Sequence, residues 1–362
     1  GEPRWLVAAP WDGGSLWVAV LENGQVQGVL LRGEAVTSVP VAPDRLPPDA
    51  PPVLVVRDGH ASLLTVPEDA SPLTAPLLLP DHDLLAYVAR NGDLVLLRGS
   101  EEMARFPVHA LPDARIVGDE EGRLLLLTDA TDVRYTHGVL GDRLEAASIT
   151  LVETSPTPRV VARMELPAPQ VVEGIAPIWA DMTGDGVREI IVTVSDGDQG
   201  ARIVAFNEAG ERVLAGPAIG RGHRWRDQLA VAPFGPDAAL ELADDLTPHI
   251  GGVVEFYRPD LAAGRLEIVA QVPGYSTHVL GSRNLGMALA GDFDGDGRVE
   301  LLAPSQDKRH LAGIRRTAGG AEVTWQLPTG GHITTNLAAV TSADGHLLLG
   351  LGRSDKILRV WP

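Results

Sequence analysis

The chain has 362 residues, a formal net charge of −18 and no cysteine. This acidic balance argues against nucleic-acid binding, which needs a basic surface, and the absence of cysteine excludes a disulfide-stapled scaffold. Apolar residues make up 44% of the sequence, which is ample for a hydrophobic core, and no apolar run reaches membrane-spanning length.

Short runs rich in Val, Leu and Ile alternate with turn clusters along the whole chain, and no convincing amphipathic helix appears. Asn-Gly and Asp-Gly pairs between such runs are the strongest short-range signal of a β-hairpin. Eight strand–turn–strand units follow one another, with turns at residues 12–14, 58–59, 91–92, 119–122, 181–189, 235–237, 292–300 and 344–345. One or two further strands follow each hairpin, so the repeating unit has about four strands.

A unit of about four strands that repeats eight times predicts an all-β protein, a single β-propeller domain over residues 1–362. The second and third units are short, and a propeller of seven blades is the alternative if they form one irregular blade. The last unit ends with a third strand at residues 356–361, so the way in which the ring closes stays open.

Residues 292–300 have the composition of a loop that binds a hard cation. Carboxylates alternate with other residues, and glycines allow a tight turn. The predicted ligands are Asp292, Asp294 and Asp296 through side-chain oxygens, Arg298 through its backbone carbonyl, and Glu300. Calcium accepts six to eight oxygens in flexible geometry, which fits better than magnesium. An EF-hand is excluded because its twelfth position here is Ala303 and the flanking residues 285–290 and 299–303 read as strands.

The same frame recurs upstream, where the corresponding positions are Asp181, Thr183, Asp185, Val187 and Glu189. Thr183 replaces one carboxylate, so weaker binding is expected at this second site. A solvated acidic hairpin is the alternative for either loop. Two loops in the same register, each between apolar strands, favour two calcium sites.

Residues 175–189 and 285–300 resemble FG-GAP or VCBS repeats, which build β-propellers such as the integrin α-subunit head. The resemblance covers two of the units, and it implies calcium-bound hairpins while leaving activity open. Calcium loops of modest affinity are most useful outside the cytosol, so an extracellular or periplasmic location is expected. The chain starts at Gly1-Glu2-Pro3 without a signal peptide, and a removed leader is therefore expected.

In a propeller, the loops before each first strand and after each second strand share the face opposite the calcium hairpins. Histidines, arginines and amides gather in these predicted loops over three neighbouring units. The candidate ligand or second metal site consists of His223, Arg224, Trp225, Gln228, His249, His278, Arg283, Asn284, His310, His332 and Asn336.

Three interpretations of this face stay open. The side chains could satisfy backbone groups where blades meet. They could bind a sugar or an anion, with arginines as donors and Trp225 and Tyr275 as stacking surfaces. His223, His278 and His332 could hold a transition metal. The pair Asp244-Asp245 is predicted to be solvated, with a catalytic role as the alternative.

The sequence contains no nucleophile elbow, phosphate loop, zinc-protease motif or dinucleotide fingerprint. The leading hypothesis is therefore an exported, calcium-stabilised binding or scaffold module for a carbohydrate or a protein, rather than an enzyme. The alternative is a metal-dependent carbohydrate lyase or dehydratase with a histidine-lined site in the channel. A subunit of a larger assembly without a ligand of its own is a third possibility.

Overall fold

The computed structural model describes residues 1–342, 345 and 347–361. Nearly all of its regular structure is β-strand. The strands are β1 (Pro3–Trp11), β2 (Gly14–Leu21), β3 (Val26–Arg32), β4 (Ala35–Val39), β5 (Leu54–Arg57), β6 (His60–Leu63), β7 (Leu77–Leu79), β8 (Leu84–Val88), β9 (Leu94–Arg98), β10 (Glu101–Phe106), β11 (Val117–Gly118), β12 (Leu124–Thr131), β13 (Glu145–Glu153), β14 (Arg159–Glu165), β15 (Val171–Val172), β16 (Ile178–Ala180), β17 (Glu189–Ser195), β18 (Arg202–Phe206), β19 (Arg212–Ala215), β20 (Arg226–Ala232), β21 (Glu241–Leu246), β22 (Val253–Asp260), β23 (Arg265–Pro273), β24 (Leu289–Gly291), β25 (Glu300–Pro304), β26 (His310–Thr317), β27 (Gly320–Pro328), β28 (Ala338–Thr341), β29 (Leu347–Gly352) and β30 (Leu358–Trp361). One 3-10 helix, η1 (Pro80–His82), precedes β8.

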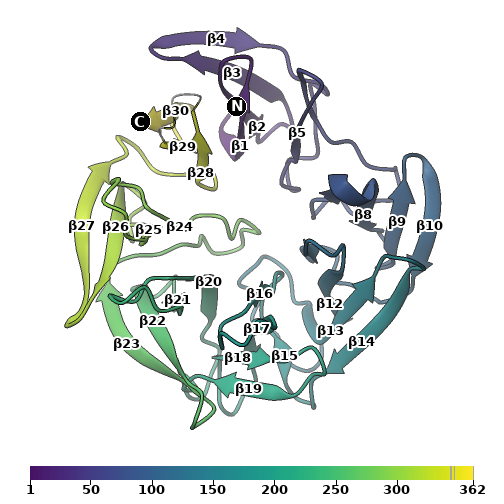
Figure 1. Cartoon of the computed structure of the whole chain (residues 1–362), viewed down its shortest axis with the longest axis vertical. Helices are drawn as coiled ribbons and strands as arrows, with labels where there is room; N and C mark the ends of the chain where they lie inside the picture. The colour runs from purple at the N-terminus through teal and green to yellow at the C-terminus, as the bar shows by residue number, and fades with distance from the viewer. Residues whose placement is uncertain (343–344, 346, 362) are drawn as a thin grey trace.

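The strands form antiparallel sheets between neighbours in sequence. Three sheets have four strands each, namely β1–β4, β7–β10 and β24–β27. A three-stranded sheet consists of β28–β30, and β5 and β6 form a two-stranded hairpin. β11 to β23 form one sheet of 13 strands, but single residue pairs link its parts, Ala146 with Val172 and Ala215 with Arg265. Figure 1 shows successive strand groups arranged around a common centre, with the two chain ends near each other. This radial arrangement is that of a β-propeller.

The radial order of the strands explains their burial. In Figure 1, β16 and β24 are the innermost strands of their own groups, and later strands of the same groups lie farther out. β17 reads EIIVTVS and is buried at every position, because neighbouring strand groups cover both of its faces. β16 and β24, the first strands of the two acidic hairpins, have three residues each and are only partly buried.

Most predicted hairpin turns lie where the structure has them, including residues 12–13, 58–59 and 91–92. One predicted strand is shorter than expected. Of residues 285–290, only the last two belong to β24. The predicted turn at residues 344–345 includes Asp344, which lies outside the described residues.

The first and last sheets meet through side chains. Leu6 and Trp17 pack with Ala338 and Val340 in one apolar cluster. The side-chain amide of Asn336 donates to the carbonyl of Leu6 at 2.8 Å and accepts from its N–H at 2.9 Å. β1 pairs with β2 in the first sheet, so it does not supply a fourth strand to β28–β30.

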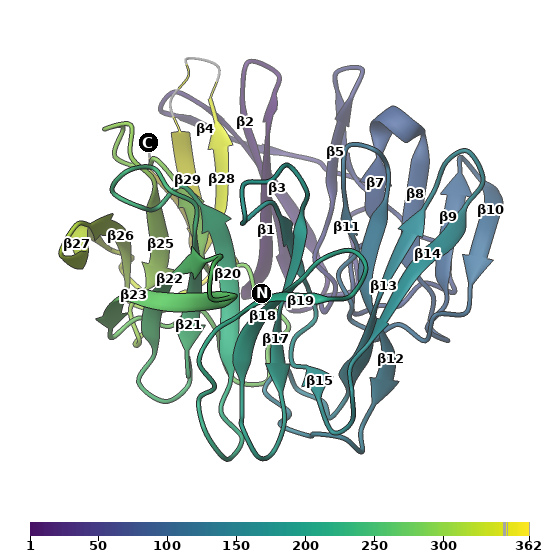
Figure 2. The ribbon, with the colours of Figure 1, turned by 60° about the horizontal axis from the view of Figure 1, so that its bottom comes forward.

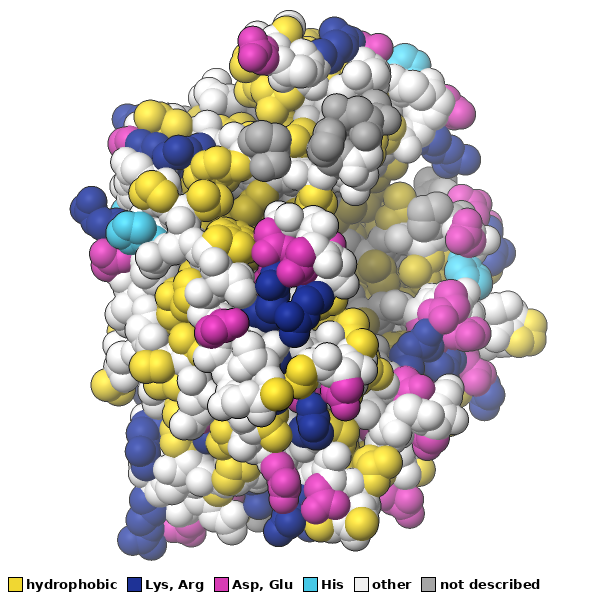
Figure 3. All heavy atoms as spheres, turned by 60° about the vertical axis from the view of Figure 1, so that its left-hand side comes forward, with side chains coloured by type: hydrophobic (Ala, Val, Ile, Leu, Met, Phe, Trp, Pro, Cys, Tyr) yellow, Lys and Arg dark blue, Asp and Glu magenta, His cyan; other side chains and the backbone are white. Residues whose placement is uncertain are grey.

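Loops collect at both ends of the strands in the side view of Figure 2. Figure 3 shows acidic and basic side chains interspersed over the side of the molecule that carries β26 and β27. Although the net charge is −18, the acidic side chains on this side do not form one continuous acidic surface. In the described part of the chain, no helix has the length and apolarity that crossing a membrane requires.

Candidate functional site

The acidic loop 292–300 joins β24 to β25 and folds around the side chain of Asp292. The Asp292 carboxylate accepts hydrogen bonds from the N–H groups of Gly295 at 2.8 Å, Asp296 at 3.1 Å and Gly297 at 2.8 Å. Gly295 and Gly297 have φ of +76° and +83°, which glycine adopts without strain. The local sequence therefore builds the turn that brings later carboxylates back toward Asp292.

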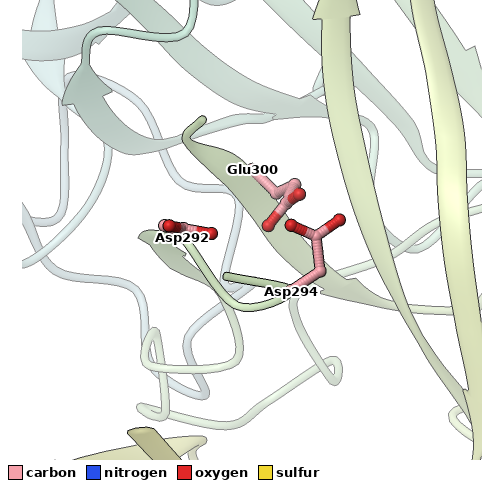
Figure 4. A group of neighbouring side chains, drawn as sticks. All are labelled: Asp292, Asp294 and Glu300. Carbon is pink, nitrogen blue, oxygen red and sulfur yellow. The ribbon is translucent and has the colours of Figure 1, made fainter. Parts of the chain in front are cut away.

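Carboxylate oxygens of Asp292, Asp294 and Glu300 lie within 4.8 Å of one another. In Figure 4 the Asp294 and Glu300 carboxylates lie side by side, and the carboxylate of Asp292 is directed toward them. Oxygens at such separations can share a hard cation, which calcium binds at about 2.3–2.6 Å from each ligand. This is the one group of three or more acidic or histidine side chains within the described residues that has such spacing. Asp296 lies outside this group.

An arginine that was not among the predicted site residues balances this loop. Arg315 on β26 contacts Asp294 at 2.7 Å, Asp296 at 2.9 Å and also Glu300. The acidic side chains of this loop therefore have a cationic partner within the protein itself. The strand register gives the reason, because Leu301 pairs with Ile314 and places Arg315 opposite Glu300.

The second acidic loop, between β16 and β17, has the same backbone pattern but different side-chain contacts. Asp181 accepts N–H groups from Gly184 at 2.7 Å and Gly186 at 2.9 Å. Glu189 accepts the N–H of Met182 at 2.8 Å and both the N–H and the hydroxyl of Thr183 at 3.1 Å.

The remaining acidic side chain of this loop, that of Asp185, accepts the N–H of Val187, whose own side chain is exposed. Asp181, Asp185 and Glu189 do not form a cation-sized group among the described residues.

On the face predicted to carry the histidines, His249 and His278 contact each other. The His249 Nε2 and His278 Nδ1 atoms are 2.7 Å apart, and His278 Nε2 lies 2.7 Å from the carbonyl of Ser282. Trp225 packs edge-on against His278. Burial lowers the pKa of His249 to about 4 and that of His278 to about 3, so both rings are neutral at pH 7.

His223 lies in a second cluster, whose other members sequence reasoning missed. Its ring stacks on Tyr135, and the ring centroid of His137 is 5.5 Å away. His137 Nδ1 contacts Glu173 at 2.6 Å, and the Ser195 hydroxyl donates to the same carboxylate. Ser195 thus bonds to the carboxylate rather than to a histidine base, which is not the arrangement of an activated nucleophile.

Several side chains proposed for sugar binding are already buried or paired. Trp225 is 2% exposed and Tyr275 is 8% exposed, so neither offers an open stacking face. Arg226 lies in the interior, where it pairs with Asp244 at 3.1 Å and with Glu255. Arg224 is exposed and donates to the carbonyl of Ile219.

The prediction that Asp244 and Asp245 are solvated is wrong, because both are 0% exposed. They lie on β21, the middle of three strands, between β20 and β22. Burial raises the pKa of Asp244 to about 8 and that of Asp245 to about 6.

Two predicted amides join neighbouring strand groups as backbone partners. Gln228 donates to the carbonyl of Ala176 at 2.9 Å and accepts the hydroxyl of Thr193, and Asn336 bonds in both directions to Leu6. His310 begins β26, and its backbone N–H donates to Ser305. These contacts agree with the interpretation that such side chains satisfy backbone groups between blades.

The long loop between β23 and β24 reaches into the centre of the ring (Figure 1). Its far end is fixed to segments more than a hundred residues earlier in the chain. Gly281 N–H donates to the carbonyl of Val139 at 2.8 Å, and Arg283 pairs with Asp113 at 2.8 Å and Asp142 at 2.7 Å. Because this loop, residues 274–288, fills part of the central opening, we call it the plug loop.

A cavity of about 410 Å³ lies between the plug loop and the first and last sheets, and we call it the mouth cavity. It brings together three predicted residues, Arg283, Asn284 and His332, with Trp5 and Leu280. Asn284 is 4% exposed, and its side-chain nitrogen is buried without a hydrogen-bond partner. His223, His278 and His332 do not form a metal-binding group among the described residues.

No family model and no curated protein matches the sequence, so the resemblance to FG-GAP or VCBS repeats stays a prediction. Solved structures are similar in fold. A crystal structure of BBS1N in complex with ARL6DN matches with a TM-score of 0.51 and 10% identity, over 99% of this chain and 91% of that one. The WD40 β-propeller domain of Doa1 matches with a TM-score of 0.47 and 8% identity, over 100% and 94%. At such identities the likeness concerns the fold, and the chain is an all-β protein with the β-propeller arrangement.

Proposed function

We propose that this protein is a propeller-based binding module that holds a protein partner at the mouth cavity. The observation that carries the proposal is the combination of exposed apolar side chains with an unpaired buried donor at this site. Leu280 is 66% exposed and Val279 is 39% exposed at the end of the plug loop. Asn284 Nδ2 offers a hydrogen bond that a peptide carbonyl can accept.

The plug loop is well suited to present these side chains. The Arg283 ion pairs and the Gly281 hydrogen bond hold its end in place, and a preorganised loop loses little entropy on binding. A carbohydrate is less well supported, because Trp225 and Tyr275 are buried and no longer offer stacking faces. A metal-dependent lyase has no supporting histidine group among the described residues.

The proposal includes eight blades. The strands fall into eight successive groups in chain order, namely β1–β4, β5–β6, β7–β10, β11–β14, β15–β19, β20–β23, β24–β27 and β28–β30. The second group has two strands and would be a reduced blade. The pairs that fuse the middle groups into one sheet are single residue pairs, as expected for contacts between adjacent blades.

The proposal also includes calcium in the loop 292–300 and a location where calcium is abundant, outside the cytosol. Asp292, Asp294 and Glu300 would hold the ion, and the ion would supply positive charge that draws the two ends of the hairpin together. The loop 181–189 is proposed as a weaker site because Thr183 and the backbone already occupy Glu189.

The binding proposal is tested by affinity capture from native extract, with chemical cross-linking to locate the contact. Leu280→Asp places a charge at the mouth and should abolish capture of a specific partner, whereas Leu261→Asp, an equally simple change at an exposed leucine in the β22–β23 turn, should retain it. Equal capture by the two variants, or cross-links confined to other surfaces, would argue against the mouth cavity.

The calcium proposal is tested by thermal unfolding of the purified protein with calcium and with a chelator. Calcium should raise the melting temperature because it binds the folded state, and Asp294→Ala should remove that rise. Asp198→Ala is the matched control, because Asp198 is an exposed aspartate outside this loop that pairs only with the exposed Arg221. A melting temperature that chelator leaves unchanged would contradict calcium stabilisation.

A further inference from the structure

We propose that Arg315 is a built-in competitor for the cation of loop 292–300, so that calcium enters this loop only by displacing the guanidinium group. The inference rests on the calcium site proposed above and adds the residue that sets its affinity. It concerns the residues of β24, β25 and β26 only, and it is independent of the mouth cavity.

The same oxygens face both cations. Arg315 contacts Asp294 Oδ2 at 2.7 Å and also contacts Glu300 Oε1, and Asp294 and Glu300 are two of the three carboxylates in the cation-sized group. A third contact, at 2.9 Å, ties the guanidinium to Asp296. A calcium ion in the group would need lone pairs that now accept hydrogen bonds from Arg315.

Electrostatic repulsion prevents calcium and the Arg315 guanidinium from occupying the loop together. Glu300 is fully buried and Arg315 is 8% exposed, so little water separates the charges. A divalent ion next to an immobile guanidinium would place three positive charges in one small cluster, and their repulsion is strong in a partly buried site. Arg315 Nε is also buried without a hydrogen-bond partner, so the guanidinium is not fully satisfied where it lies. Its displacement into water would satisfy that group.

The other acidic loop provides an internal comparison. Ile190 pairs with Phe206, as Leu301 pairs with Ile314, so Asn207 stands at the position that Arg315 occupies opposite the glutamate. The Asn207 side chain turns back on its own loop, where it bonds to Glu211 and to the N–H of Ala209. The two loops therefore share one frame but balance their charge in different ways.

Two consequences follow. Loop 292–300 binds calcium more weakly than its carboxylates alone would, which suits exchange at the high calcium concentrations outside cells. The loop also keeps its shape when calcium is scarce, because Arg315 then holds Asp294 and Glu300 together. Calcium binding and Arg315 pairing are thus linked equilibria, and removal of one strengthens the other.

The experiment is calcium titration by isothermal calorimetry on metal-stripped wild type, Arg315→Gln and Arg315→Lys. Gln removes the charge but keeps much of the size, and we expect it to tighten calcium binding by about tenfold or more. Lys keeps the charge without the planar fork and should give an intermediate affinity. Asn207→Gln changes the equivalent position of the other loop and should leave the affinity of loop 292–300 unchanged.

The outcomes separate this inference from the calcium proposal. If wild type and Arg315→Gln bind calcium equally tightly, the competitor role is overturned and the calcium site stands. If only Arg315→Gln binds, the competitor role holds and calcium is not a ligand of the native chain. If neither binds, both are overturned. Should Arg315→Gln require calcium to fold, its chelator sensitivity exceeds that of wild type, which supports the competitor role, and Arg315→Lys supplies the affinity comparison.

Discussion

Asp227 and Asp245 place two carboxyl groups opposite each other in the interior, on the paired strands β20 and β21. They are 2% and 0% exposed. Burial and the charges of Asp245 and Asp244 raise the pKa of Asp227 well above its usual value, and burial raises that of Asp245 to about 6. Two buried like charges on directly paired residues disfavour double ionisation, so the pair retains a proton near neutral pH.

This proton links stability to pH. The folded state binds it more tightly than the unfolded chain, so the pair's contribution is complete below the unfolded aspartate pKa of about 3.9 and is lost as pH rises through about 6 and beyond. Asp227→Asn removes one of the two charges. We therefore expect the unfolding free energy of the variant, relative to wild type, to increase by about 1–3 kcal/mol between pH 5 and pH 8.

Urea denaturation at several pH values measures this difference. His249 and His278 titrate in the opposite sense, since burial lowers their pKa values, but they are present in both proteins and cancel in the comparison. Asp49→Asn, at an exposed aspartate, is the control and should show no pH-dependent difference. Parallel pH profiles for Asp227→Asn and wild type would show that the pair holds no shared proton.

Single residues differ in how far the sequence predicts their surroundings. Arg315 could have been found by counting outward in both directions from the turn between β25 and β26, because antiparallel pairing then puts it opposite Glu300. The contact between His137 and Glu173 carries no such signal, since the two lie 36 residues apart in different strand groups. Asp244 and Asp245 were misjudged because polarity alone suggests solvent, whereas a central strand buries whatever it carries.

At the scale of elements, the hairpins were predictable because Asp-Gly and Asn-Gly turns and apolar runs are local signals. The plug loop was not. Residues 285–288 are apolar enough to read as strand, yet the pairings that hold this segment are made by Arg283 and Gly281 with residues near 113 and 140. Such long-range contacts override local propensity.

The plug loop supplies a prediction at this scale. Arg283→Gln removes two ion pairs and leaves Asp113, which is 3% exposed, without its cationic partner. We expect a loss of about 2–4 kcal/mol in unfolding free energy, because an unpaired buried carboxylate is costly. Faster amide exchange should be confined to residues 276–286, and deuterium exchange read by mass spectrometry checks this.

Arg221→Gln is the matched control, because its pair with Asp198 is exposed on both sides and contributes little. If the plug loop exchanges at the wild-type rate in Arg283→Gln, the ion pairs do not hold it in place. The position of Leu280 at the mouth cavity would then have another cause.

For the whole molecule, the arrangement of sheets around a centre was predicted from the repeating unit, and the ring's junction was not. The sequence ends its last unit after three strands, and the structure adds no fourth strand from the N-terminus. Instead β1 packs against the last sheet through apolar side chains and through Asn336. The amide of Asn336 imitates a backbone peptide, because it offers one donor and one acceptor to Leu6.

Asn336→Leu tests whether that junction limits the stability of the whole molecule. Leucine is close in size but leaves the N–H and the carbonyl of Leu6 unpaired, and Leu6 is fully buried. Each unsatisfied buried group costs about 1–3 kcal/mol, so the variant should lose about 2–5 kcal/mol in urea denaturation. Asn91→Ala, which alters an exposed amide that bonds within its own turn, should cost under about 1 kcal/mol.

The location of the damage distinguishes a junction from an ordinary buried contact. If the first and last sheets hold the ring together, amide exchange in Asn336→Leu should accelerate in β1, β2, β28 and β29 together, although these strands lie at opposite ends of the sequence. If exchange accelerates in β28 and β29 alone, the first sheet is held by its own packing. The ring would then be closed by the apolar cluster around Trp17 rather than by the Asn336 bridge.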